Sequence, residues 1–135
     1  MQIGIIYSSD KKVLDKLAQG LKKGLEEQGV SVILFADDAP NFRGLAMCKY
    51  LFIGSYKTAV FKPKTPQRLR DALNKVPGMA GKKSIAFIPR GGMGERKALL
   101  AVMNDMEKQG CYVVDQHSFS SEKEAYEFGK NVNLK

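Results

Sequence analysis

Five short apolar runs, separated by stretches with helical periodicity, constrain the fold of this chain more than any other feature. The runs cover residues 2–7, 31–36, 49–54, 84–89 and 111–115. Each run is nearly continuous in apolar residues, which is typical of a strand that is buried on both faces of a parallel sheet. Strands that alternate with helices predict an α/β domain, and right-handed crossovers leave few possible topologies.

The segments between these runs carry helix signals. They predict helices over residues 11–28, from Thr65 and Pro66 onward, over residues 95–109, and after Ser121. Thr65 followed by Pro66 is typical of a cap and a helix start, because proline is preformed for the first helical position. Ser121 with Glu124 three residues later predicts a capping box. Residues 37–48 contain a proline and a glycine, so they predict an irregular crossover.

Size and charge limit the class of protein to which the chain can belong. Its 135 residues suit one domain, spanning residues 1–135, and 44% of them are hydrophobic, which is enough for a core. No apolar run is long enough to cross a membrane and no secretory signal is visible, so we expect a cytoplasmic protein. The net charge of +8 predicts attraction to anionic partners, although a solvated lysine-rich surface explains it equally well. The lysines are not interleaved with aromatic residues, which disfavours nucleic-acid binding.

Parallel sheets bind ligands beyond the carboxyl ends of their strands, so the loops at that edge are the candidate sites. These loops are residues 8–12, 37–41, 55–64, 90–94 and 116–120. In the first loop, serine hydroxyls, lysine charges and the N–H groups of the next helix can hold an anion, although Asp10 opposes one. The alternative is a turn with solvated lysines. The glycines after Arg90 permit positive φ and close approach to a flat ligand, or to an anion beneath Arg90; the alternative there is a flexible connection.

Three segments resemble the flavodoxin-like family, and they fall in order over nearly the whole chain. Residues 5–7 (IIY) resemble the family's first strand, and the residues after them align without a gap with its phosphate loop, S-x-T-G-N-T-x-x-L-A. Residues 51–56 (LFIGSY) resemble its third strand and following loop, usually G-S/T-P-x-Y. Residues 85–87 and 91–95 resemble its fourth strand and glycine-rich loop. The phosphate loop departs from the family at its centre, where K-K-V-L replaces T-G-N-T.

The resemblance implies a three-layer α/β sandwich whose five-stranded parallel sheet has the order 2-1-3-4-5. It also implies that the protein binds flavin mononucleotide (FMN) and transfers electrons, with the phosphate on the first loop and the isoalloxazine ring between the other two. The implied cofactor-binding residues are Ser8, Ser9, Asp10, Lys11, Lys12, Ser55, Tyr56, Lys57, Thr58, Ala59, Arg90, Gly91, Gly92, Met93 and Gly94. Because a flavin carries its own chemistry, no side chain need act as acid, base or nucleophile.

Many basic residues lie in the loops at this carboxyl edge, and they lead to two hypotheses. Flavodoxins are typically acidic, so an electron carrier of this charge implies an acidic redox partner. The alternative is a flavin-free binding or regulatory module that kept the fold and uses its basic edge for another anion or an acidic partner protein.

Four side chains outside these motifs carry further expectations. We expect Phe61 to pack in the core and Tyr56 to lie half-buried at the rim. Cys48 and Cys111 start the third and fifth strands, about 9–10 Å apart by strand spacing, which is too far for a disulfide. His117 is the only histidine, which excludes a metal site built from several histidines.

Overall fold

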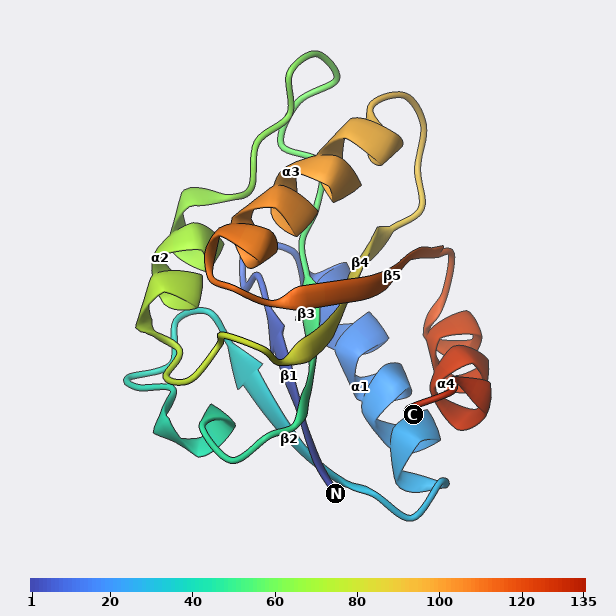
Figure 1. Cartoon of the computed structure of the whole chain (residues 1–135). Coiled ribbons are helices and arrows are strands. Elements are labelled where there is room, and N and C mark those ends of the chain that lie inside the picture. The colour runs from blue at the N-terminus through green and yellow to red at the C-terminus, as the bar shows by residue number, and fades with distance from the viewer.

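The computed structural model describes all residues from Met1 to Lys135 and shows a three-layer α/β sandwich (Figure 1). Its strands are β1 (Gln2–Tyr7), β2 (Ser31–Ala36), β3 (Tyr50–Gly54), β4 (Lys83–Pro89) and β5 (Tyr112–Phe119). All neighbouring strands pair in parallel, and their order is β2-β1-β3-β4-β5, which confirms the predicted topology. The order reverses between β1 and β3, so the carboxyl ends of these strands form the switch point at which such sheets bind ligands.

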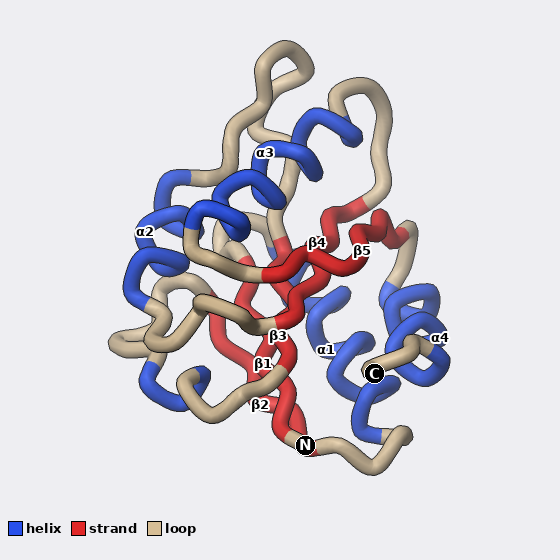
Figure 2. Tube along the Cα trace, in the orientation of Figure 1, coloured by secondary structure: helices blue, strands red, loops and turns tan.

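Four α-helices cover the two faces of the sheet. They are α1 (Lys12–Glu26), α2 (Gln67–Lys75), α3 (Glu95–Lys108) and α4 (Glu122–Asn131). Helices α1 and α4 lie on one face, and α2 and α3 lie on the other (Figures 1 and 2). Because successive strand residues point to opposite faces, Phe52 on β3 packs with the α1 and α4 side, whereas Leu51 and Ile53 pack with the α2 and α3 side.

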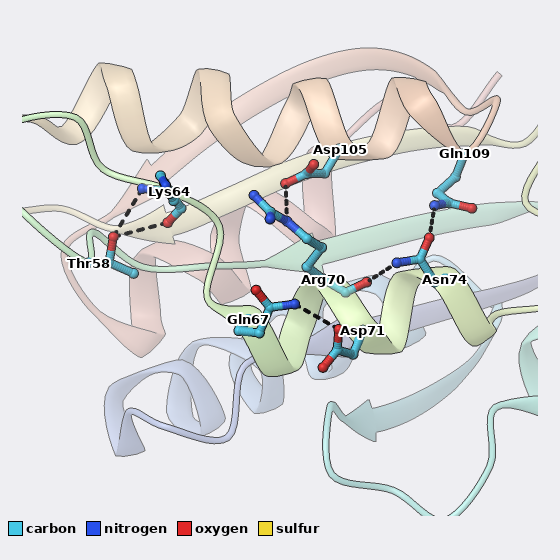
Figure 3. Close-up of polar contacts among 8 residues, drawn as sticks. All are labelled: Thr58, Lys64, Gln67, Arg70, Asp71, Asn74, Asp105 and Gln109. Atoms are coloured by element: carbon cyan, nitrogen blue, oxygen red, sulfur yellow. Dashed lines mark hydrogen bonds and ion pairs between the residues drawn. The ribbon is translucent and has the colours of Figure 1, made fainter.

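Polar contacts link α2 to α3 (Figure 3). The guanidinium Nε of Arg70 lies 3.6 Å from a carboxylate oxygen of Asp105, an ion pair that is too long for a hydrogen bond. The side-chain amide of Gln109 donates to the side-chain oxygen of Asn74 at 2.5 Å. These contacts fix α2, and therefore the end of the loop that precedes it, against α3.

Helices α1 and α4 approach closely because glycines lie between them. A Cβ atom on Gly24 would overlap the backbone carbonyl of Tyr126 and would lie 2.8 Å from the backbone nitrogen of Lys130. Gly20 and Gly129 are crowded by backbone atoms in the same way. Since packed interiors leave no spare space for an added methyl group, this helix pair requires glycine at its contact.

The fifth strand is longer than predicted. It continues through Phe119 instead of ending at Asp115, so the prediction of a site loop at residues 116–120 is wrong. The strand lies at the edge of the sheet, and most of its side chains are exposed or half-buried. Polar residues are therefore tolerated there, and the apolar pattern stops before the backbone pairing does.

The helix starts agree with the predictions in part. Ser121 caps α4, because its hydroxyl accepts a hydrogen bond from the N–H of Glu124 at 3.1 Å. Thr65 does not cap α2, so that prediction is wrong: Pro66 takes the N-cap position, and the hydroxyl of Thr65 is buried without a partner. The crossover after β2 forms only a short 3-10 helix at Arg43–Leu45. None of the helices is both long enough and apolar enough to span a membrane.

Candidate functional site

Backbone pairing brings three of the predicted loops to one edge of the sheet. Residues 8–12, 55–64 and 90–94 are the β1, β3 and β4 loops. The N–H of Ser8 donates to the carbonyl of Gly54, and the N–H of Ser55 donates to the carbonyl of Phe87. These bonds continue the ladder past the strands, so the loops leave the same end of the sheet (Figure 2).

In the β1 loop, side chains of this protein engage the backbone donors that would face an anion. Ser8 is fully buried, and its hydroxyl accepts from the N–H of Asp10 at 3.4 Å. The N–H of Ser9 donates to Oδ1 of Asp37 at 2.9 Å. Asp37 is 5% exposed, and its Oδ2 has no hydrogen-bond partner. The sequence prediction did not include Asp37 among the binding residues, although its position directly after β2 is a signal for it.

Asp10 is held by side chains from two other elements. The hydroxyl of Tyr56 donates to its Oδ2 at 2.9 Å. Arg68 on α2 lies 3.5 Å from its Oδ1 and also donates to the hydroxyl of Ser9 at 3.2 Å. Burial and the hydrogen bond to Asp10 raise the pKa of Tyr56, and the ammonium of Lys11 lies 5.2 Å from the centroid of its ring. Tyr56 is half-buried, which confirms its predicted place at the rim.

The amino end of α1 is open toward solvent. Lys11 is the N-cap residue in an extended conformation, and no side chain caps the helix. The first helical N–H groups, with Lys11 and Lys12 beside them, are therefore able to hold a small anion. Val13, in the first turn of α1, is 43% exposed.

Lys57 closes the space between the β3 and β4 loops. Its ammonium donates to the carbonyl of Gly91 at 3.0 Å and to the carbonyl of Met93 at 2.7 Å. The loops also touch directly, because a Cβ atom on Gly94 would lie 2.8 Å from the carbonyl oxygen of Val60. The two hydrogen bonds of Lys57 form a bridge between the loops, here named the Lys57 clamp.

Two glycines of the β4 loop adopt the predicted positive φ angles, and the backbone N–H of Gly91 is already hydrogen-bonded within the chain. Gly92 and Gly94 have positive φ angles of 62° and 89°. The N–H of Gly91 donates to the carboxylate of Glu95 at 3.1 Å. Hydrogen bonds from Ser118 and from the backbone of Gly91 lower the pKa of Glu95. The N–H of Gly91 is therefore already hydrogen-bonded to Glu95 and is not available to a ligand anion.

Arg90 points away from the β4 loop. Its guanidinium pairs with the carboxylate of Glu124 on α4 at 2.9 Å and donates to the carbonyl of Ser118 at 3.3 Å. The prediction that Arg90 lies above this loop is wrong, because a carboxylate on α4 offers a partner that the glycine-rich loop does not.

The tip of the β3 loop projects from the molecule (Figure 1). The hydroxyl of Thr58 accepts from the N–H of Lys64 at 3.0 Å and donates to its carbonyl at 3.1 Å, which pinches the loop into a hairpin (Figure 3). Ala59 is exposed within this hairpin. Phe61 is 77% exposed, so the prediction that it packs in the core is wrong. The pinched loop carries its tip residues away from the sheet, where their only neighbours are residues of the β4 loop and the start of α3.

These contacts decide whether FMN suits the residues present. The resemblance to flavodoxins implies an isoalloxazine ring between the β3 and β4 loops, where the Lys57 clamp closes the space. It implies a phosphate on the β1 loop, where Asp37 takes the N–H of Ser9 and Asp10 adds a second negative charge. The buried hydroxyl of Ser55 and Oδ2 of Asp37 both lack a partner, and of the two only the hydroxyl is able to donate a hydrogen bond to a ligand. With the Lys57 clamp closed, the residues as a set do not fit FMN.

The chain matches no protein-family model and no curated protein. A flavodoxin from the domain Archaea is 15% identical with a TM-score of 0.75, over 96% of this chain and 94% of that chain. Oxidised flavodoxin 1 from Bacillus cereus is 16% identical with a TM-score of 0.72, over 96% of this chain and 95% of that chain. The flavodiiron protein from Giardia intestinalis is 16% identical with a TM-score of 0.74, over 96% of this chain and 34% of that chain. At such identities the likeness is one of architecture, and the protein has the flavodoxin-like fold.

Proposed function

We propose that this protein is a flavodoxin-fold binding module that works without flavin and binds an acidic partner protein at the carboxyl end of its sheet. The Lys57 clamp is the observation that carries the proposal. It joins the two loops between which a flavin ring would lie, and it does so with a cation of the protein itself.

The distribution of charge at this end of the sheet supports an acidic partner. Four of the carboxylates at this end accept hydrogen bonds or ion pairs from the chain itself, whereas Asp38 is exposed and unpaired; the four are those of Asp10, Asp37, Glu95 and Glu124. Several exposed cations form no ion pair; they are Lys11, Lys12, Lys62, Lys64, Arg96 and Lys97. The free charge at this edge is therefore positive, which selects and steers an acidic protein.

A second candidate is FMN binding with electron transfer to an acidic redox partner. The likeness to flavodoxins favours it at the level of the fold. The open amino end of α1 and the positive φ angles of Gly92 and Gly94 also favour it. FMN would supply the redox chemistry, and the protein would tune it. This candidate requires Lys57 to release the β4 loop.

Titration of the purified protein with FMN separates the two candidates. Flavin fluorescence and the visible spectrum report binding, both aerobically and anaerobically. We expect no saturable quenching up to about 100 μM FMN, with an apoflavodoxin titrated in parallel as the positive control. Saturable quenching below that concentration would replace the proposed function with that of an electron carrier that has an altered phosphate loop.

A further inference from the structure

We propose that the two clamped loops form a docking surface for an acidic protein segment that inserts one apolar side chain between Val60, Phe61 and Met93. This inference rests on the proposed function and names the place and chemistry of the contact. The docking surface comprises residues 57–64 of the β3 loop and residues 91–97, which include the β4 loop and the first turn of α3.

The docking surface is fastened from within. The Lys57 clamp ties the β3 loop to the β4 loop, and the paired hydrogen bonds between Thr58 and Lys64 close the hairpin (Figure 3). Lys62, at the hairpin tip, is the only non-glycine residue with a positive φ, at 49°. Such strained backbone persists only where neighbouring contacts enforce it. Loops ordered in advance lose less entropy when a partner binds, which favours a docking role.

An apolar cluster lies exposed at the centre of this surface. Val60, Phe61 and Met93 are 45%, 77% and 72% exposed. Together with Gly94 they line a cavity of about 300 Å³ between the hairpin and the start of α3. Single exposed apolar side chains are common, but three around one concavity on fastened loops are typical of a site for an apolar anchor.

Cations form the rim of the same surface. Arg96 and Lys97 line the cavity itself, and Lys62 and Lys64 lie on the hairpin beside it. None of these four forms an ion pair within the chain. An apolar centre with a polar, charged rim is the usual anatomy of a protein interface. The charge of this rim selects glutamate and aspartate around the inserted side chain.

The geometry favours an acidic protein segment over two other anionic partners. Binding to a lipid surface usually relies on an amphipathic helix with a broad apolar face, whereas this surface offers three side chains around a concavity. Single-stranded nucleic acid is held by successive aromatic platforms, whereas Phe61 is the only aromatic residue here. A protein segment with one apolar side chain between acidic residues matches both the cavity and the rim.

Two labelled peptides test the inference by fluorescence anisotropy at low salt, about 20 mM. One carries glutamates on both sides of a central leucine, and the other has serine in place of the leucine. We expect the wild-type protein to bind the leucine peptide at least about fivefold more tightly, because part of the leucine side chain is buried. Phe61→Ala should remove this preference. Tyr112→Ala, which truncates an exposed aromatic at the amino end of β5, should keep it.

Charge variants test the rim. The double variant Lys64→Ala with Lys97→Ala should weaken binding of both peptides. The matched control is Lys49→Ala with Lys83→Ala. It removes equal charge from exposed sites at the amino ends of β3 and β4, on the opposite side of the domain from the docking surface, and should weaken binding less.

The outcomes separate this inference from the proposed function on which it rests. Equal affinity for the two peptides would overturn the apolar anchor but leave the proposed function standing. Failure of both peptides to bind would overturn both. Binding to phosphatidylserine vesicles without binding to either peptide would identify a lipid-binding surface and would also overturn both.

Discussion

Replacing Lys57 with alanine should open the β4 loop without unfolding the domain. Each hydrogen bond of the clamp stabilises the closed loops by about 1.5 kcal/mol, the lower end for a charged donor, because Lys57 is only half-buried. Ordering the lysine side chain costs about 1–2 kcal/mol. The two bonds together therefore leave a net stabilisation of about 1–2 kcal/mol, which corresponds to a change of about 5- to 30-fold in the opening equilibrium.

Native-state hydrogen exchange of the Gly91 amide reports on the mobility of the β4 loop that the clamp holds. That amide donates to the carboxylate of Glu95, the first residue of α3, and exchange requires this hydrogen bond to break. We expect exchange about 5- to 30-fold faster in Lys57→Ala. Lys64→Ala is the matched control, because it removes an exposed lysine from the same hairpin and leaves the clamp intact. Equal exchange rates in the wild type and in Lys57→Ala would refute the clamp.

The net stabilisation of the closed loops also limits how much the clamp can weaken the affinity for FMN. A ligand that must first open the loops loses affinity by the factor that closure represents. Lys57→Ala should therefore bind FMN at most about 30-fold more tightly than the wild type. Titration of both proteins with FMN measures this ratio of affinities. A gain in affinity above about 30-fold would show that Lys57 opposes flavin binding through more than these two hydrogen bonds.

Three further changes have expected results. Gly24→Ala should lower the free energy of unfolding by about 1–3 kcal/mol in urea titrations, because its methyl group collides with the α4 backbone; Gly91→Ala, where a Cβ meets nothing within 4 Å, should be neutral by comparison. Glu95 has a lowered pKa in the folded state, so its stabilising effect is present above its ordinary pKa of 4.5 and is lost as the pH falls through the folded value. Glu95→Gln should therefore flatten the acid limb of stability measured by thermal unfolding against pH, and an unchanged limb would contradict that role. The double change Lys11→Ala with Lys12→Ala should weaken binding of the acidic peptides at low salt while leaving FMN fluorescence unaffected; weaker flavin binding would instead support a phosphate on the β1 loop.

The sequence by itself determined the order and type of most elements in this protein. The apolar runs predicted all five strands, and helical periodicity, with the Ser121 cap at α4, predicted the four helices, because these signals act over a few neighbouring residues. The resemblance to flavodoxins added the strand order, which local patterns do not contain. From that order, the meeting of the β1, β3 and β4 loops at one edge follows, since parallel strands end on the same side.

Only the tertiary structure decided what these loops do with their side chains. Lys57 reaches Gly91 across 34 residues of sequence, and Arg68 reaches Ser9 across 59. The outward position of Phe61 depends on the hairpin that Thr58 closes, and the extension of β5 depends on its pairing with β4. Hydrogen bonds and burial of this kind depend on which distant segments meet in space, and neither propensity nor periodicity encodes that meeting.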